Sequence, residues 1–532
     1  MQTANESFLK TTWSFLWRVS HWPAKASGWF WRTVFWPVRF AYRKSETLTR
    51  MVAWMRLHRK RLTAAFLMIA HLLGMIASVN VLSESRTPQG AIAWIVSLNT
   101  FPYVAVPLYW TIGETDYGEH ALTYRASRSS GTHIVEQLYD DLREAKLAVP
   151  VEDSTQRLLT RLVQFPVTRG NRAKLLVDGP ETFDAMLQSI ESAKTYILVE
   201  FYIIHDDQLG GRLKELLIAK ASEGVRVRLL YDEYGSRDLP DEYIEELRAN
   251  GIKVHGFNSP FGGGSTTRLN FRNHRKLVIV DGITAFAGGH NVGDEYLVGV
   301  DELGPYRDTS VQVEGPLVQC CQVAFAEDWH AVSKELLDDL NWTPVASEEP
   351  GVEGICVPSG PADEFETASL FFMQSILSAK KRIWIASPYF VPDEKMATTL
   401  QLAAMRGVDV RILIPQNSDS TLVWLSSFSY FGEMNAAGVR VYRYQGRFMH
   451  QKVLLVDDTM AAVGTANFDN RSFRLNFEIM LAFFDESFSQ EVAEMFEDDL
   501  RYCTLSDGSE LEEKSYAFQL LVRAARLLAP IQ

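Results

Sequence analysis

Two stretches of the chain, NHRKLVIVDG at residues 273–282 and MHQKVLLVDD at residues 449–458, repeat one unusual pattern 176 positions apart. In each, a lysine follows the histidine at +2 and an aspartate at +7, and a glycine and an asparagine follow at +14 and +17. The first set is His274, Lys276, Asp281, Gly288 and Asn291, and the second is His450, Lys452, Asp457, Gly464 and Asn467. Chance does not keep so many spacings twice, so the repeat predicts two half-sites that join in one bilobed site.

These residue types suit chemistry at a phosphodiester. A neutral imidazole can attack phosphorus, and a second imidazole can protonate the leaving alkoxide. A lysine two residues farther along an extended strand points to the same side as its histidine, so its ammonium can neutralise phosphoryl oxygens in place of a metal. The two asparagines add uncharged donors. We therefore predict an enzyme that needs no metal ion and no other cofactor.

Carboxylates complete each half. Asp281 and Asp457 end apolar runs that read as buried strands. Each histidine also needs an acid on its second ring nitrogen. Glu478 lies 28 residues after the second histidine and Asp308 lies 34 after the first, which predicts one such acid in each half. The predicted catalytic set is His274, Lys276, Asp281, His450, Lys452 and Asp457, and the predicted substrate-binding set is Asn291, Asn467, Asp308 and Glu478.

The repeat extends beyond these motifs. ESAKTYILVEFYI at 191–203 matches LSAKKRIWIASPYF at 377–390, and EGVRVRLLYD at 223–232 matches RGVDVRILIP at 406–415. Amphipathic helical segments alternate with apolar strands, which is typical of an α/β fold with helices covering a mixed sheet. We predict two pseudo-twofold lobes at 171–343 and 344–505, a linker and helical region at 114–170, and a C-terminal helix within 506–532.

The N-terminal part has a different composition. Residues 62–82 and 91–113 contain no Asp, Glu, Lys or Arg, and each is long enough to cross a bilayer as a helix. A buried core helix of a soluble domain is the alternative, but such helices rarely run past twenty residues without a charge. We predict a transmembrane hairpin over 62–113, with Pro102 and Pro107 kinking the second helix.

Residues 1–61 carry twelve Lys and Arg against two acids, together with seven of the thirteen tryptophans. Such a segment suits the cytoplasmic face of a membrane, because tryptophans favour the headgroup layer and basic residues favour the inside. A poorly ordered tail and a nucleic-acid arm are the other interpretations. The net charge of −13 for the whole chain leaves −23 after this +10 segment, a poor partner for nucleic acid. The four cysteines show neither zinc spacing nor a disulfide framework.

The paired triplets match the HxK-x4-D signature of the phospholipase D superfamily. After residue 61 the chain resembles bacterial cardiolipin synthases over almost its whole length, with motifs in the same order at FAGGHNVGDEYL (286–297), GPYRDTSVQVEGP (304–316) and NFDNRSFRLNFE (467–478). Gly289 and Thr465 stand where many superfamily members have serine.

The resemblance implies two phospholipase D-like lobes and a phosphatidyl transfer from one phosphatidylglycerol to a second, which gives cardiolipin and glycerol. It implies that His274 forms a phosphohistidine and that His450 acts as acid and then as base. It also implies that Asp281 and Asp457 act mainly in holding each half-site together. It also implies phospholipid partners and a multi-pass protein of the bacterial inner membrane, with its lobes in the cytoplasm.

Several alternatives stay open from the sequence. The nearly equivalent half-sites allow the two histidines to exchange roles, and water could replace the lipid acceptor and yield phosphatidic acid. Phosphatidylethanolamine or another polyol could serve as the acceptor, and the oligomeric state is undetermined. A membrane-tethered nuclease or a scaffold without catalysis is a further alternative, although both triplets are intact.

Overall fold

The chain is described by a computed structural model that covers residues 54–55, 57–84, 88–113, 124, 131–151, 153–257, 270–299, 305–347 and 351–532. It divides into two compact units, Met1–Gly113 and Glu114–Gln532, and each is considered by itself. Most of the basic segment predicted at 1–61, and much of the linker predicted to begin at 114, lie outside the described residues.

The described part of the first unit contains three helices, α5 (Arg59–Glu84), α6 (Pro88–Thr100) and α7 (Pro102–Leu108), followed by a π-helical turn at Tyr109–Gly113. Among the described residues, one helix, Arg59–Ser83, is long and apolar enough to cross a membrane by length and composition, with a mean hydropathy of 2.1. The second predicted span, 91–113, is divided between α6 and α7. The division falls at Pro102, because proline cannot donate the backbone hydrogen bond that would continue the helix.

Small residues let α5 approach α6 closely. Gly74 lies where an added Cβ would come within 2.2 Å of the Leu98 carbonyl oxygen. Beside it, Asn99 Nδ2 donates to Ser78 Oγ at 2.8 Å. Much of the α5 surface stays exposed within this unit, including Met68 at 72% and Val79 at 62%. The unit therefore packs through one face and leaves large apolar side chains unburied.

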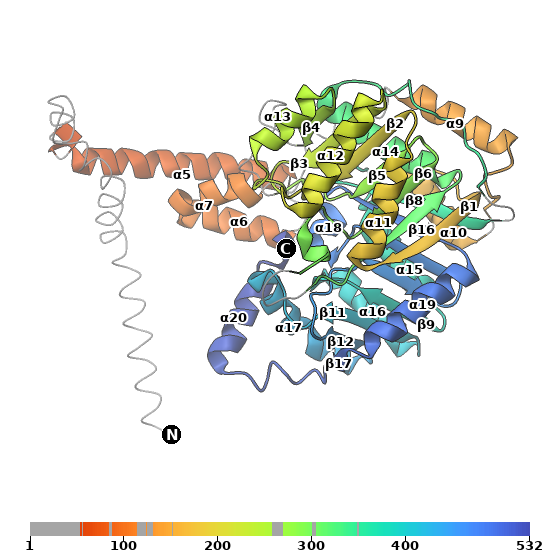
Figure 1. Cartoon of the computed structure of the whole chain (residues 1–532). Helices are drawn as coiled ribbons and strands as arrows, with labels where there is room; N and C mark the ends of the chain where they lie inside the picture. The colour runs from red at the N-terminus through yellow and green to blue at the C-terminus, as the bar shows by residue number, and fades with distance from the viewer. Residues whose placement is uncertain are drawn as a thin grey trace. The chain divides into compact units, whose positions relative to one another are not determined.

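A 15-stranded sheet runs through the described part of the second unit (Figure 1). Its strand order is β17-β12-β11-β9-β13-β14-β16-β8-β1-β7-β6-β5-β2-β3-β4. The strands of the first half are β1 (Thr168–Val177), β2 (Tyr196–Phe201), β3 (Arg226–Asp232), β4 (Lys253–Phe257), β5 (Leu277–Val280), β6 (Thr284–Gly288) and β7 (Thr309–Glu314). Those of the second half are β8 (Val352–Ser359), β9 (Arg382–Ala386), β11 (Asp409–Pro415), β12 (Arg440–Tyr444), β13 (Val453–Val456), β14 (Met460–Gly464), β16 (Glu478–Phe483) and β17 (Cys503–Leu505). Two short strands, β10 (Phe390–Val391) and β15 (Phe468–Asp469), pair separately.

The order of equivalent strands is the same when read outward from the central β1–β8 pair, with β17 added beyond β12. The strands β2, β3 and β4 run parallel, as do β9, β11 and β12. The strands that follow the histidines, β5 and β13, run antiparallel to β2 and β9. This confirms the predicted α/β class with a mixed sheet.

Helices cover both faces of the sheet. In the first half these are α9 (Thr132–Glu144), α10 (Ser154–Val163), α11 (Asp178–Glu191), α12 (Gln208–Ser222), α13 (Asp241–Ala249), a 3-10 turn (Asp294–Tyr296) and α14 (Leu317–Ser333). In the second half they are α15 (Thr367–Ser378), α16 (Glu394–Met405), α17 (Thr421–Ala436), α18 (Asn470–Arg474), α19 (Glu486–Leu500), α20 (Tyr516–Arg526) and a 3-10 turn (Ala529–Ile531). The helices α14 and α19 each pack on strands of both halves, so neither half has its own separate inner core.

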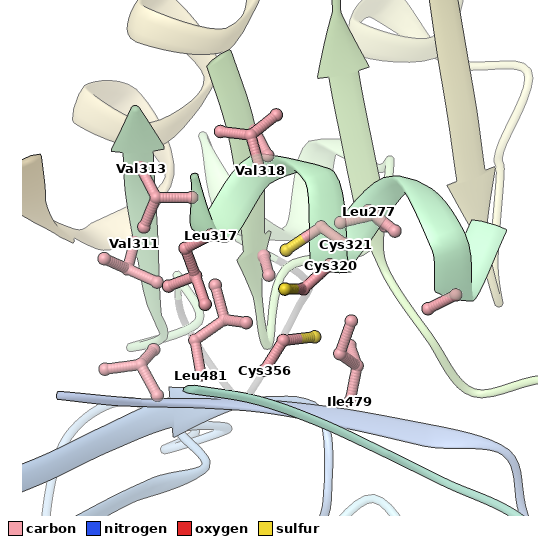
Figure 2. Close-up of a cluster of buried hydrophobic side chains, with 14 of the residues drawn as sticks. Leu277, Val311, Val313, Leu317, Val318, Cys320, Cys321, Cys356, Ile479 and Leu481 are labelled. Carbon is pink, nitrogen blue, oxygen red and sulfur yellow. The ribbon is translucent and has the colours of Figure 1, made fainter. Parts of the chain in front are cut away.

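Figure 2 shows that shared core. Leu317 and Cys320 of α14 lie above Cys356 of β8 and Leu481 of β16, which come from the other half. All four side chains are at most 1% exposed. This apolar contact fixes the two halves against each other and so fixes the facing ends of their strands.

Candidate active site

Each predicted histidine lies in an extended segment directly before a buried strand. His274 precedes β5 and His450 precedes β13, and both are buried, at 8% and 7% exposure. Each lysine turns back on its own half, because Lys276 Nζ donates to the His274 carbonyl oxygen at 2.7 Å and Lys452 Nζ donates to that of His450. Each lysine therefore lies in the same buried half-site as the histidine two residues before it, as the alternation of side chains along an extended segment predicted.

The two acids are exchanged between the halves. His274 Nδ1 lies 2.9 Å from Glu478 Oε2, and His450 Nδ1 lies 2.7 Å from Asp308 Oδ2. The sequence spacing predicted that each acid serves the histidine of its own half, and this pairing is wrong. The two acids do occupy equivalent positions, because β7 and β16 pair with β6 and β14 in the same register.

Short backbone bridges between the halves cause the exchange. His274 N donates to the Phe477 carbonyl oxygen at 2.9 Å, which places the histidine beside the neighbouring Glu478. In the same way His450 N donates to the Arg307 carbonyl oxygen at 2.8 Å, beside Asp308. Each histidine segment therefore pairs with the segment that begins the acid-bearing strand of the opposite half.

Both acids are ionised and fully buried. Burial raises the pKa of Asp308, but Lys452 and His450 outweigh it and bring that pKa to about 2. Burial likewise opposes ionisation of Glu478, yet its pKa is lowered by the nearby His274. With 0% of either side chain exposed, each acid contacts an imidazole and has no free surface for a substrate. Their geometry is that of positioning residues, which differs from the predicted substrate-binding role.

Burial disfavours the charged form of both histidines. Burial lowers the pKa of His274 to about 4, despite the opposing charge of Glu478, and burial also lowers the pKa of His450. A carboxylate can only accept a hydrogen bond, so Nδ1 of each ring carries a proton and donates it. The neutral ring of His274 is therefore left with a free lone pair on Nε2, the form that an attacking imidazole needs.

The charges of the two lysines affect the pKa values of groups in both half-sites. Burial lowers the pKa of Lys276 well below its ordinary value, and Lys452 lowers it further. Burial brings the pKa of Lys452 to about 8, with Asp308 and Glu478 opposing the shift. Since Lys452 also lowers the pKa of His274, the charges of the two halves interact in one buried site.

The two aspartates of the triplets lie at the opposite end of their strands. Asp281 accepts hydrogen bonds from the backbone N–H groups of Lys194, Thr195 and Tyr196 at 2.7–2.9 Å. Burial raises the pKa of Asp281, but the hydrogen bond from the Thr195 hydroxyl, together with these backbone hydrogen bonds, outweighs it and lowers the pKa overall. Asp457 caps the backbone N–H groups of residues 380–382 in the same way, at 2.7–3.0 Å. This geometry supports the structural role expected for both aspartates.

The asparagines lie within the half-sites and are 4% exposed. Asn291 Oδ1 accepts from Ile203 N and its Nδ2 donates to Tyr296 Oη, both at 3.3 Å. Asn467 Oδ1 is buried without a hydrogen-bond partner. The amide of Asn467 thus keeps unused hydrogen-bonding capacity.

Gly289 and Thr465, each 15 residues after a histidine, fit the acids Asp308 and Glu478. At Gly289, an added Cβ would come within 2.0 Å of Asp308 Oδ1, so glycine makes room for that carboxylate. Thr465, at the equivalent position, donates to Glu478 Oε2 at 2.6 Å. Ser472 of α18 donates to the other oxygen of Glu478 at 2.7 Å. The departures from serine therefore match the two different acids.

The sequence did not reveal the role of Tyr296. Its hydroxyl lies 3.3 Å from His450 Nδ1, although it belongs to the first half. The quoted motif GDEYL contains this residue, but a tyrosine near an apolar run is more often part of the core. Only the fold shows that it reaches the other half-site.

No group of three or more His, Cys, Asp or Glu side chains suited to a metal ion occurs within the described ranges. The cysteines are free, with Cys320, Cys321 and Cys356 buried and Cys503 half-buried. Burial raises the pKa of Cys320 and Cys356 well above the ordinary value, so these thiols behave as core residues.

Comparison with known proteins agrees with this geometry. The family described as "Cardiolipin synthase, PLD-like domain" matches residues 186–329 and 372–500, one segment in each half. Cardiolipin synthase A of Pseudomonas putida strain GB-1 is 44% identical over 87% of this chain and 97% of its own length. Cardiolipin synthase A of Pseudomonas fluorescens strain SBW25 is 44% identical over 88% and 98%.

A solved structure shows the same fold at low identity. Phosphatidylserine synthase of Haemophilus influenzae aligns with a TM-score of 0.56 and 15% identity, and the match covers 72% of this chain and all of that one. Both matched segments contain a histidine half-site, and the curated relatives align over nearly their whole length. The chain therefore belongs to the cardiolipin synthase family of proteins with phospholipase D-like domains.

Proposed function

We propose that the protein transfers the phosphatidyl group of one phosphatidylglycerol to a hydroxyl of a second, which gives cardiolipin and releases glycerol. As a member of the cardiolipin synthase family it is a phosphatidyltransferase. The observation that carries the reaction is the pair of buried imidazoles, each oriented by an acid from the opposite half.

The first step uses His274 as the nucleophile. Its Nε2 forms a bond to phosphorus while the bond to the glycerol oxygen breaks, and His450, which enters this step as an imidazolium, donates its Nε2 proton to the leaving alkoxide and becomes neutral. The low pKa of His274 keeps its ring neutral for this attack. The ammonium groups of Lys276 and Lys452 and the amides of Asn291 and Asn467 stabilise the charge on the phosphoryl oxygens.

The second step reverses these roles for a new alcohol. His450 takes the proton from the acceptor hydroxyl, the acceptor oxygen bonds to phosphorus, and the bond between phosphorus and His274 breaks. Glu478 and Asp308 hold the two rings in the required tautomer throughout. This sequence needs no metal ion, so dialysis against a chelator should leave turnover unchanged.

The segments outside the halves serve membrane attachment. We assign 62–82 and 91–113 to membrane insertion and 1–61 to the cytoplasmic interface, with lobes 171–343 and 344–505, joined through 114–170 and followed by 506–532, in the bacterial cytoplasm. The long apolar helix α5 supports this arrangement. Attachment keeps the site beside its lipid substrates. Removal of 1–61 should weaken binding to anionic liposomes, and unchanged binding would contradict the interfacial role.

Purified protein in liposomes with labelled phosphatidylglycerol tests the reaction. Cardiolipin and an equal amount of free glycerol are expected, and a His274→Ala variant prepared in the same way should form neither. Phosphatidic acid as the main product would make the protein a hydrolase. Addition of phosphatidylethanolamine tests the acceptor, and cleavage of plasmid DNA without lipid turnover would point to a nuclease.

A further inference from the structure

An arginine beside His274 is buried without the hydrogen bonds that a guanidinium needs. Arg272 is 2% exposed, and within the described residues none of its three side-chain nitrogens has a hydrogen-bond partner. Asp232 Oδ1 forms an ion pair with Arg272 Nη1 at 3.8 Å, a distance too long for a hydrogen bond. A guanidinium carries five N–H donors, so the hydrogen-bonding capacity of this side chain is unused.

Asp232 accepts no hydrogen bond from Arg272, because its oxygens accept from backbone groups. Its Oδ1 accepts from the backbone N–H groups of Tyr234 and Gly235 at 2.9 Å, and its Oδ2 accepts from Asn273 N at 3.0 Å. Burial raises the pKa of Asp232 to about 6, with Arg272 opposing the shift. The carboxylate thus shapes the local backbone, and it leaves the guanidinium stacked at 4.7 Å from the centre of the Tyr234 ring.

A second arginine contributes to the charge of this region. Burial lowers the pKa of Arg471, Tyr202 and Asp469 oppose that shift, and the charge of Arg272 adds to it. Burial raises the pKa of Tyr202, as does Asp232, and both arginines oppose that rise. A buried guanidinium without hydrogen-bond acceptors favours an added anion.

Tyr202 connects this cationic region to the reacting centre. Its ring packs against that of His274 with 4.9 Å between centroids, and Lys276 Nζ lies 5.2 Å from the ring centre. Arg272 also precedes His274 by two residues, about 7 Å along an extended chain. The three-carbon headgroup of phosphatidylglycerol separates its free hydroxyl from its own phosphate by a similar length.

The other half has no counterpart to this arginine. Phe448 occupies the position two residues before His450, and its ring packs 4.7 Å from that of Tyr306 and 5.8 Å from that of His450. A site for a second anion would therefore occur in the first half only, whereas the residues around the reacting phosphate are repeated in both halves.

Resting on the proposed transfer reaction, we propose that Arg272 binds the phosphodiester of the acceptor lipid. The acceptor is thus held by its own phosphate while its hydroxyl reaches the phosphorus on the enzyme. Free glycerol has no phosphate and cannot use this subsite. The subsite therefore favours a lipid alcohol over small alcohols and water.

The test compares two acceptors on the same protein in liposomes. One assay measures cardiolipin from labelled phosphatidylglycerol, and the other measures incorporation of labelled free glycerol into phosphatidylglycerol, which needs donor cleavage but no acceptor phosphate. Arg272→Gln should lower the ratio of cardiolipin formation to glycerol exchange by about tenfold or more. Arg272→Lys, which keeps the charge but loses the planar fork, should fall between this variant and the wild type.

Arg237→Gln is the matched control. Arg237 also lies over the Tyr234 ring, at 5.4 Å, but its side chain is 63% exposed and is paired with Asp238. Its removal deletes one nearby positive charge and should leave the ratio unchanged. An equal change in both arginine variants would mean a general field effect and would overturn the subsite.

The remaining outcomes separate the two proposals. Absence of cardiolipin from the wild type would refute the proposed function, whereas wild-type synthesis with an unchanged ratio in Arg272→Gln would refute only the subsite. An equal fall in both assays would assign Arg272 to the donor. Inhibition by inorganic phosphate that disappears in Arg272→Gln, with the lipid ratio unaltered, would assign the subsite to free phosphate instead.

Discussion

The regions around His274 and His450 share their reacting groups but differ in the side chains that surround them. Beside His274 lie Tyr202 and the cationic Arg272, whereas His450 is surrounded by the rings of Tyr296, Tyr306 and Phe448. The histidine, lysine and oriented acid are repeated because both ends of a phosphoryl transfer need the same proton chemistry. The surrounding side chains are not repeated, which indicates that the two sides of the site hold different parts of the substrates.

Removal of either histidine should have the largest effect. His274→Ala and His450→Ala should each lower cardiolipin formation by about four orders of magnitude or more, because nucleophile and acid act as one unit. The two can be told apart by quenching wild-type protein in base during turnover of labelled phosphatidylglycerol and mapping the phosphorylated peptide. Label on the peptide containing His274 is expected, and label on His450 would exchange the assigned roles.

Neutralising the acids should have the next largest effect and tests their exchange. Glu478→Gln and Asp308→Asn should each lower activity by about two to four orders of magnitude, because the amide can no longer hold the reactive tautomer. A carboxylate raises the pKa of the imidazole that it contacts, so Glu478→Gln should lower the pKa of His274 further and leave that of His450 nearly unchanged. NMR titration of the labelled imidazoles measures this, and the opposite pattern would show pairing within each half.

The pH profile should show a moderate effect from Lys452. Its pKa of about 8 means that the ammonium loses its proton above that pH, and with it the charge that stabilises the phosphoryl oxygens. The rate should therefore fall as pH rises through about 8, while the neutral His274 keeps its form down to about pH 4. Lys452→Arg should shift the alkaline limb upward wherever activity remains, since arginine stays charged. An alkaline limb that does not move would exclude Lys452 as its source.

The aspartate of the triplet should matter least for chemistry and more for stability. Asp457→Asn weakens the cap on three backbone N–H groups and should cost about 1–2 kcal/mol of unfolding free energy, with a small change in kcat. The matched control is the neighbouring Asp458→Asn, because Asp458 pairs at the surface with Lys381 and Arg382 and should cost at most about 0.5 kcal/mol. Thermal melting of both variants measures the difference, and a large loss of turnover at full stability would give Asp457 a direct catalytic role.

The sequence was sufficient for features that depend on spacing along the chain. The apolar runs after His274 and His450 predicted β5 and β13, and the superfamily resemblance implied the structural role of Asp281, which lies at a strand end. The equivalence of Asp308 and Glu478 also followed from their placement at the start of alternating strands, despite the longer loop before Asp308.

The sequence failed where the two halves meet. Spacing within one half cannot reveal that Phe477 pairs with the segment of His274, and this bridge decides which acid reaches which ring. The same limit hid Tyr296, which acts across the halves, and Arg272, whose lack of partners appears only when its surroundings are known. The break between α6 and α7 is different in kind, because Pro102 was noted but a kink was expected in place of an end.

The exchange of Glu478 and Asp308 makes each half inseparable from the other. One half expressed alone would hold a histidine and a lysine, but its acid would point at a neighbour that is missing. Two copies of the same half, related by a twofold axis, could complete each other and restore both pairs. The single chain thus resembles a fused homodimer. The residues that surround each histidine could diverge, but the acid that each half supplies to the histidine of the other could not.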